Sequence, residues 1–526
     1  MAELTQLTLH SMIDRTARQH PGRQAVVLST PSGERTLSYG ELAENAARLA
    51  GGLRRLGLHS GDCLLSWLPN IPEWFVVEVA AASLGIVAIP VNTRYRAAEM
   101  ANILDASQAR VVIVAEGFAG VDFSALLGEA VRGSRLEHVI DVSGTADRAV
   151  PWRGLLTGDS AAPHGQPTDL ANVFCTSGTT SSPKLAAHDQ ASIVTHADND
   201  VRAYGIRPGD VMLLSLPVSG VFGFSGAMAA LSAGATAVLQ PIFNADEALE
   251  LMARYTVTHF YGPDGMLRAV LDAAGGPHPG FDRWRWGAFA NFTGKPMELV
   301  ETAERFADVQ LHGTYGSSEC FALMSAWPRD APPDVRAQGG GYLVSRDMEV
   351  RCVDPETDAV RQPGEPGELQ FRGYNVLPCY LGNPEATSAA FTDDGWFRSG
   401  DLGELRPDEA FVYLARLKDS LRLRGYLVDP QEIEEQLLDH PAVEAVQLVG
   451  VWRAGEGDIP VAFVRPRDLA SPDEQALVDF ARRRMASYKV PRRILTVDEF
   501  PTTDSPNGRK IQKHRLRETA RKELGL

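Results

Sequence analysis

Cysteine is scarce in this chain, and its few cysteines form no motif. They lie too far apart in the sequence for a C-x-x-C site of the kind that binds zinc or carries out thiol redox chemistry. An odd, scattered set also argues against a disulfide framework. We therefore expect free thiols in a reducing compartment, at Cys63, Cys175, Cys320, Cys352 and Cys379.

The sequence also lacks a long hydrophobic run and an excess of basic residues. Its most apolar stretch, 79–91, is too short to span a bilayer and contains Pro90. No charged segment followed by an apolar core is present near the N-terminus, so we expect no signal peptide and a cytoplasmic location. The 51 Lys and Arg residues are outnumbered by 67 Asp and Glu residues, and the net charge of −16 argues against nucleic-acid binding.

What the chain does contain is a regular alternation of apolar strands with helices. At 526 residues it is too long for a single core. The strands expected at 63–68, 87–91 and 111–114 are apolar on both faces, which is typical of a parallel sheet covered by helices on both sides. The fold class is therefore α/β, with a second α/β subdomain expected from about residue 170 to 325.

The pattern changes in the last third of the chain. Between 340 and 413 the strands are short and are separated by Gly and Pro, which predicts a small β-barrel or a distorted sheet. A compact α+β unit follows. We expect a large N-terminal domain at 1–417, consisting of two doubly wound α/β subdomains plus this barrel, and a small C-terminal domain at 418–526.

A loop rich in hydroxyl groups follows an expected strand at the sequence CTSGTTSSPK, 175–184. Its hydroxyls and backbone N–H groups suit phosphate oxygens, and Lys184 supplies a mobile positive charge. The spacing differs from that of a Walker A loop. Taken alone, such a loop is more often a polar turn between two elements than a phosphate site.

Four further motifs follow in order along the chain: YGSSE at 315–319, GWFRSGD at 395–401, a stretch from Arg416 to Gly425, and GRKIQK at 508–513. Together with the Ser/Thr loop they resemble the adenylate-forming superfamily, which includes acyl-CoA synthetases, luciferases and peptide-synthetase adenylation domains. The resemblance covers nearly the whole chain. It implies a mobile C-terminal domain and a reaction that brings the α-phosphate of ATP to a carboxylate.

The resemblance also implies a role for individual residues. Lys510 would be the catalytic lysine, with Lys513 as the alternative, and Lys184 would act on the triphosphate. Glu319 would bind Mg²⁺, Lys418 would be the hinge, and Gly425 would line the CoA channel. The nucleotide would be held by Thr176, Ser177, Gly178, Thr179, Thr180, Tyr315, Ser318, Asp401 and Arg416, and the acyl pocket formed by Gly220, Val221, Phe222, Phe289 and Gly316.

Three departures from the family pattern bear on the acyl pocket. Ser181 stands where the phosphate loop usually has Gly, Gly220 stands where a histidine is common, and the sequence AFANF at 288–292 replaces a Gly-Gly-Ala-Pro stretch. A further position bears on the substrate. Gly223 occupies the place of an aspartate that pairs with the α-amino group in amino-acid-activating relatives. Because a buried ammonium without a counter-charge is costly, we expect an uncharged hydrophobic acid as substrate.

The predicted function is that of an ATP- and Mg²⁺-dependent acid–thiol ligase. It would form an acyl-adenylate, release pyrophosphate and transfer the acyl group to CoA, acting on small molecules as a monomer or homodimer. One alternative keeps the adenylation but passes the acyl group to an amine or a carrier protein. Another is a non-catalytic adenylate-binding homologue.

Overall fold

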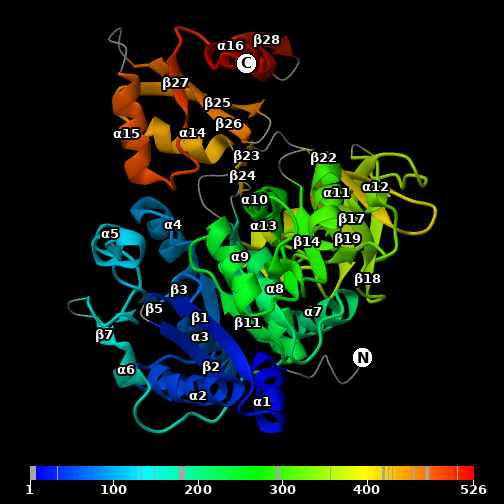
Figure 1. The fold of residues 1–526 in the computed structure, drawn as a ribbon. Coiled ribbons are helices and arrows are strands. Elements are labelled where there is room, and N and C mark those ends of the chain that lie inside the picture. Colours follow the sequence, from blue (N-terminus) through cyan, green and yellow to red (C-terminus); the bar gives the residue numbers. More distant parts are fainter. Residues whose placement is uncertain are drawn as a thin grey trace.

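The computed structural model describes residues 8–526 apart from 32, 132, 147–148, 177–183, 292–295, 356, 418–420, 425, 429, 454–455, 468–472 and 506–507, and apart from certain further side chains, among them those of Arg416 and Lys510. A large N-terminal domain carries a small C-terminal domain on one end (Figure 1). This confirms the predicted fold class.

The first sheet of the large domain has eight strands. Six of them run parallel, namely β8, β4, β3, β5, β6 and β7. β9 and β20 add to one edge in antiparallel fashion. The order is β20 (Cys379–Tyr380), β9 (Lys184–Asp189), β8 (Leu170–Thr176), β4 (Val87–Pro90), β3 (Cys63–Trp67), β5 (Val111–Val114), β6 (His138–Asp141) and β7 (Val150–Pro151).

The second sheet is also mainly parallel, with an antiparallel hairpin at one edge. Its order is β13 (Gly262–Pro263), β14 (Trp286–Ala290), β12 (His259–Phe260), β10 (Val211–Leu214), β11 (Thr236–Leu239), β1 (Gln24–Thr30) and β2 (Gly33–Ser38), and β15 (Gln310–Gly313) pairs with β14. The N-terminal hairpin thus joins the second sheet, while the strand before the Ser/Thr loop joins the first. This differs from the expected division of the chain near residue 170.

Helices pack between and around these sheets. Leu64, Ala88 and Phe174 of the first sheet share one buried cluster with Leu214 and Ala237 of the second. The helices of the large domain are α1 (Leu9–Gln19), α2 (Tyr39–Arg55), α3 (Pro72–Ser83), α4 (Ala97–Ser107), α5 (Phe123–Ala130), α6 (Trp152–Leu155), α7 (Gln190–Ala203), α8 (Val221–Ala233), α9 (Ala245–Arg254), α10 (Asp264–Ala274), α11 (Pro296–Ala307), α12 (Pro333–Arg336) and α13 (Pro384–Ala389).

Local sequence explains where α2 begins. Ser38 accepts a hydrogen bond from the backbone N–H of Glu41, and the Glu41 carboxylate accepts one from the N–H of Ser38. These two bonds satisfy N–H groups that would otherwise have no partner at the start of a helix. The capping box predicted from the sequence is therefore present.

The region expected as a small β-barrel is a six-stranded antiparallel sheet. Its order is β16 (Ser325–Ala326), β17 (Gly340–Leu343), β22 (Phe411–Arg416), β21 (Phe397–Leu405), β19 (Gly367–Gly373) and β18 (Met348–Val353). Asp401 on β21 stands opposite Arg416 on β22 in the strand register.

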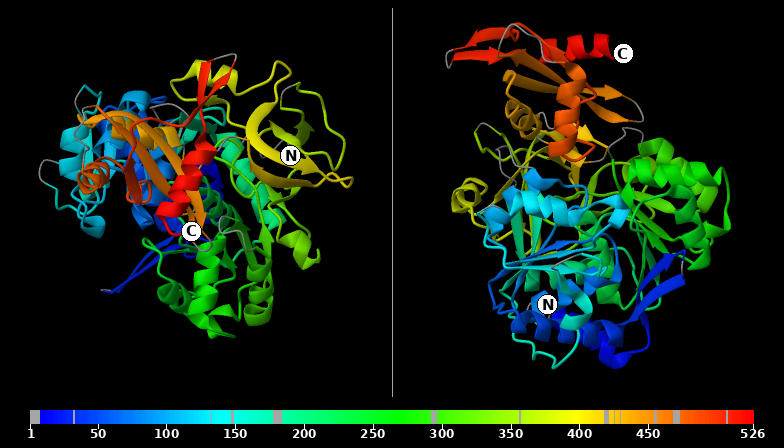
Figure 2. Two further views of the ribbon diagram at one scale, coloured as in Figure 1. Left: turned by 90° about the horizontal axis from the view of Figure 1, so that it is seen from above. Right: turned by 90° about the vertical axis from the view of Figure 1, so that its left-hand side faces the viewer.

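The C-terminal domain has its own sheet and core. The sheet order is β24 (Tyr426–Val428), β23 (Leu421–Leu423), β26 (Gly457–Pro466) and β25 (Val443–Arg453), with β27 (Arg493–Thr496) beside β26, and helices α14 (Pro430–Leu438) and α15 (Glu474–Arg484) pack on it. A hairpin of β28 (Thr502–Ser505) and β29 (Gly508–Ile511) precedes the last helix, α16 (Lys513–Glu523). Figures 1 and 2 show this hairpin at the outer end of the small domain, remote from the large one.

Candidate active site

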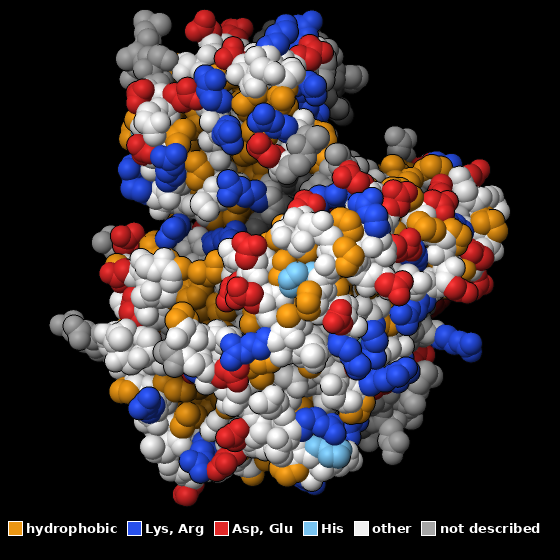
Figure 3. Space-filling model, in the orientation of Figure 1, with side chains coloured by type: hydrophobic (Ala, Val, Ile, Leu, Met, Phe, Trp, Pro, Cys, Tyr) orange, Lys and Arg blue, Asp and Glu red, His pale blue; other side chains and the backbone are white. Residues whose placement is uncertain are grey.

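A cavity of about 1780 Å³ lies where the two domains meet. Strand ends and loops of all three sheets of the large domain line it, and residues of the C-terminal domain, such as Trp452 and Lys489, close one side. Figure 3 shows a furrow between the two domains with Lys and Arg side chains beside it. Ten of the predicted site residues line this cavity: Thr176, Lys184, Gly220, Val221, Phe222, Tyr315, Gly316, Ser318, Glu319 and Asp401.

The two ends of the Ser/Thr loop are fixed by neighbouring strands. Thr176 ends β8, Lys184 begins β9, and the Thr176 hydroxyl donates to the Lys184 carbonyl at 3.2 Å. The loop between them therefore starts and ends at the cavity wall. The predicted phosphate-binding residues Ser177, Gly178, Thr179 and Thr180 lie outside the described residues.

Glu319 and Lys184 share a neighbour that the sequence interpretation missed, Tyr380. The Tyr380 hydroxyl donates to Glu319 Oε1 at 3.0 Å, and the Lys184 ammonium lies 5.0 Å from the centre of the Tyr380 ring. Tyr380 reaches this place because β20, which lies some 200 positions further along the chain, pairs with β9. The short Cys-Tyr strand carries no sequence signal of its own, so only the sheet pairing reveals it.

Glu319 is the residue predicted to bind Mg²⁺, and it lines the cavity. Among the described residues no group of three or more His, Cys, Asp or Glu side chains could hold a metal ion. Mg²⁺ commonly binds through one or two carboxylates together with substrate phosphates, rather than in a protein cage. Glu319, which shares the neighbour Tyr380 with Lys184, fits that mode of binding, with the nucleotide supplying the other ligands.

Tyr315 and Asp401, both predicted to contact the nucleoside, are brought together. The Tyr315 hydroxyl donates to Asp401 Oδ2 at 2.6 Å. The Tyr315 ring stacks on Phe371 with 5.4 Å between ring centres. Tyr315 and Asp401 also line the cavity, so an aromatic face and a carboxylate stand side by side there. Arg416 lies opposite Asp401 by backbone pairing, although its side chain is outside the described set.

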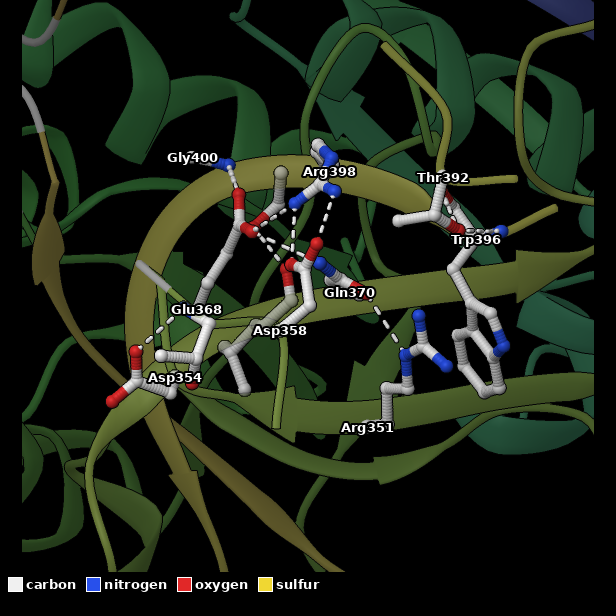
Figure 4. A network of polar contacts seen from close by, with 12 residues as sticks. Arg351, Asp354, Asp358, Glu368, Gln370, Thr392, Trp396, Arg398 and Gly400 are labelled. Atoms are coloured by element: carbon white, nitrogen blue, oxygen red, sulfur yellow. Dashed lines mark hydrogen bonds and ion pairs between the residues drawn. The ribbon is translucent and has the colours of Figure 1, made fainter. Parts of the chain in front are cut away.

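A polar network supports the part of β21 that carries Asp401 (Figure 4). Glu368 accepts hydrogen bonds from the backbone N–H of Gly400 at 3.1 Å and from the Gln370 amide at 3.0 Å. Arg398 forms a two-pronged pair with Asp358, with N–O distances of 2.7 and 2.6 Å. Because paired charges and bidentate contacts restrict side-chain motion, this network fixes the position of Gly400 and of the adjoining Asp401.

The start of α8 contributes apolar residues, Val221 and Phe222, to the cavity lining. Gly220 is the N-cap residue of that helix, and no side chain caps its first turn. The uncapped N–H groups of the helix carry partial positive charge and favour a carboxylate. A Cβ atom at Gly223 would lie 2.3 Å from the Pro217 carbonyl oxygen, so this backbone has no room for an aspartate there.

The prediction that Phe289 lines the acyl pocket is wrong. Phe289 does not line the cavity; it is fully buried in the core of the second sheet with Leu213 and Phe260. Successive side chains of β14 point to opposite faces, and the cavity is lined instead by Ala290 and Asn291. Gly316 does line the cavity, and a Cβ atom there would approach the Phe321 carbonyl oxygen to 2.3 Å.

The predicted catalytic lysine lies on the outer hairpin. Lys510 is in β29, opposite Thr503 of β28, and its side chain is not among those described. Lys513, the alternative, lines the cavity and lies 3.6 Å from Glu434. Lys418 and Gly425, the predicted hinge and CoA-channel residues, are outside the described residues.

The fold and cavity together define an enzyme that handles a nucleotide between a large and a small domain. The chain belongs to the AMP-binding enzyme family, whose pattern matches residues 13–381, and the AMP-binding enzyme C-terminal domain matches 432–507. This confirms the resemblance seen in the motifs. No described helix is long and apolar enough to cross a membrane.

Similar proteins are ligases that act on carboxylic acids. The mitochondrial medium-chain acyl-CoA ligase ACSF2 of Pongo abelii is 27% identical, over 99% of this chain and 89% of its own. The 4-coumarate–CoA ligase 1 of Solanum tuberosum is 27% identical, over 96% of this chain and 93% of its own. The solved structure of the amide bond synthetase McbA from Marinactinospora thermotolerans superimposes with a TM-score of 0.83 at 24% identity, covering 98% of this chain and 99% of that one, and so shares the fold.

The family and these relatives support acid–CoA ligase activity, and the chain is an AMP-forming, acyl-CoA synthetase-like enzyme. Use of ATP and CoA follows from that membership.

Proposed function

We propose that the enzyme converts an uncharged hydrophobic carboxylic acid and ATP to an acyl-adenylate, releasing pyrophosphate, and then transfers the acyl group to the thiol of CoA. The observation that carries this proposal is one cavity lined both by Lys184, Glu319 and Asp401 and by apolar residues around the start of α8. Phosphates and an acid are both negatively charged, so the reaction requires positive groups between them.

Different residues of the chain serve different parts of this reaction. Lys184 and the Ser/Thr loop hold the phosphates, while Tyr315 and Asp401 hold the nucleoside. A carboxylate oxygen of the substrate then attacks the α-phosphorus, and the bond to pyrophosphate breaks. Glu319, together with the nucleotide, would hold Mg²⁺, which would supply further positive charge. In the second step the CoA sulfur attacks the acyl carbon, and AMP leaves.

Two arrangements of the C-terminal domain are needed for the two steps. In the present one the β28–β29 hairpin that carries Lys510 is at the outer end of the small domain (Figure 1). We propose that rotation at Lys418 brings Lys510 into the cavity for adenylation. Its ammonium then stabilises the charge shared between the acid and the α-phosphate.

The acid is expected to be hydrophobic because the described residues at the start of α8 that line the cavity carry no charge. The apolar lining residues of the cavity include Val221, Phe222 and Met266. Competition among a medium-chain fatty acid, a benzoate-type acid and an α-amino acid of similar size tests this. We expect the amino acid to have the lowest kcat/KM; if it had the highest, this view of the pocket would be wrong.

The acceptor is tested by product mass. The enzyme is incubated with ATP and acid, and in parallel reactions with CoA, with an amine or with a carrier protein bearing a thiol arm. We expect the thioester of CoA as the main product. A dominant amide would favour the amine-acceptor alternative, which the structural likeness to an amide bond synthetase supports.

A further inference from the structure

The segment that follows Glu319 adopts an unusual backbone conformation. Phe321 and Leu323 have φ angles of +64° and +61°, in the left-handed region that residues other than glycine rarely adopt. Both side chains are buried. The chain folds back on itself here, because the Ser317 N–H donates to the Phe321 carbonyl at 3.1 Å. Such a conformation persists only where the surroundings hold it in place.

Two buried histidines hold this segment at both ends. His188 Nε2 donates to the Ser318 carbonyl at 2.8 Å, next to Glu319. His196 Nε2 donates to the Ala322 carbonyl at 2.7 Å, between the two left-handed residues. The Phe321 ring lies between the imidazoles, with ring-centre distances of 4.0 Å to His188 and 4.7 Å to His196.

The proton position on His196 is set by its outer neighbours. The Asn199 amide donates to the Tyr374 hydroxyl at 2.8 Å, and that hydroxyl lies 3.2 Å from His196 Nδ1. Tyr374 can therefore donate to Nδ1, which leaves the hydrogen on Nε2 for the carbonyl. A carboxylate oxygen of the buried Asp200 is 3.5 Å from the same Nε2.

We propose that His188 and His196 are positioning residues that act through residues 318–323. His188 sets the place of Glu319, and His196 sets the wall of the acyl pocket that Ala322 and Leu323 form. This rests on the proposed function, in which Glu319 serves Mg–ATP and the apolar part of the lining takes the acid.

The test compares KM for Mg–ATP with KM for the acid in single variants. We expect His188→Leu to raise KM for Mg–ATP about tenfold, and His196→Leu to raise KM for the acid by about as much, since each loses one positioning hydrogen bond. His188→Gln and His196→Gln keep a donor at nearly the same place and should recover most of the loss. Tyr374→Phe should shift the acid KM in the same direction as His196→Leu.

His259 is a matched control, because it is equally buried and lies 3.1 Å from the Tyr204 carbonyl oxygen, away from the Glu319 segment. His259→Leu should lower the melting temperature without changing KM for Mg–ATP and KM for the acid to different extents. If His188→Leu and His196→Leu behave like His259→Leu, the positioning role is refuted. If either fails to fold, the Gln variants and Tyr374→Phe decide the question. Wild-type turnover, measured first, tests the proposed function separately.

Discussion

Tyr380 links two charged residues that line the cavity. Its hydroxyl bonds the Glu319 carboxylate and its ring faces the Lys184 ammonium. A carboxylate oriented in this way needs less rearrangement when Mg²⁺ and the phosphates bind.

Tyr380→Phe should therefore raise KM for Mg–ATP about tenfold, the order expected for loss of a hydrogen bond to a charged group. Steady-state kinetics at varied Mg–ATP measures this. Tyr342→Phe is the matched control, because Tyr342 also donates to a carboxylate, Asp408 at 2.7 Å, but at the surface. Equal kinetics in the two variants would contradict a role for Tyr380.

Lys510→Ala should abolish adenylation but spare acyl transfer, because the lysine acts only on charge present in the first transition state. Pyrophosphate release with ATP and acid measures the first step, and conversion of supplied acyl-adenylate with CoA measures the second. Near-normal pyrophosphate release would show that Lys510 is not the catalytic lysine, and Lys513→Ala would be the next variant to test.

Motif residues were easier to predict than their neighbours. Thr176, Lys184, Glu319 and Asp401 belong to motifs with characteristic spacing and all line the cavity. Phe289 was misassigned because the sequence alone did not give the face to which each side chain of β14 points. Tyr380, His188 and His196 were missed because their partners are distant in sequence, and only tertiary structure brings them together.

At the scale of whole elements, strands that are close in sequence belong to different parallel sheets. The alternation of strands and helices was readable because buried parallel strands are apolar throughout. The sequence did not show which sheet each strand joins, because the N-terminal hairpin belongs to the second sheet and β8 to the first, and the two sheets share one core. Lys184 at the start of β9 and Val221 at the start of α8 therefore line the same cavity, although they adjoin different sheets.

Two strands of the second sheet bury histidines that affect acid stability. Burial lowers the pKa of His259 to about 4 and that of His312 to about 3, from 6.5. Neither nitrogen of His312 has a hydrogen-bond partner among the described residues. Between pH 6.5 and about 4 the unfolded chain binds these protons and the folded chain does not. The free energy of unfolding should therefore fall as the pH is lowered through that window.

His312→Phe should reduce this loss, since it keeps a ring next to Trp286 and removes one titrating group. Denaturant unfolding at pH 7 and pH 4 should show a loss smaller by on the order of 3 kcal/mol in the variant. The same loss in both proteins would mean that His312 does not resist protonation in the fold.

In the whole molecule, a buried lysine joins the two domains. Lys489 of the C-terminal domain is buried and donates to Glu99 of the large domain at 2.9 Å and also to Glu432 of its own domain. Burial alone would lower the pKa of Lys489, but the two carboxylates raise it well above its usual value. The Glu99 contact must break if the small domain rotates, so it stabilises the present arrangement.

Glu99→Gln should weaken this arrangement while leaving Lys489 paired with Glu432. We expect acyl transfer from supplied acyl-adenylate to fall about tenfold and adenylation to be unchanged or faster, because one partner of a buried ion pair is lost. Single-turnover rates of the two half-reactions give the ratio of the acyl-transfer rate to the adenylation rate. Glu444→Gln, which removes a surface pair with Arg465 inside the small domain, is the control. An unchanged ratio in Glu99→Gln would argue against the contact between domains as a determinant of the balance.

Acid-dependent exchange of labelled pyrophosphate into ATP, measured without CoA across a panel of carboxylic acids, tests adenylation most directly. We predict exchange that requires Mg²⁺ and a hydrophobic acid and is lost in Glu319→Gln. No exchange with any acid, from a folded protein that still binds ATP, would contradict adenylation and favour a non-catalytic adenylate-binding protein.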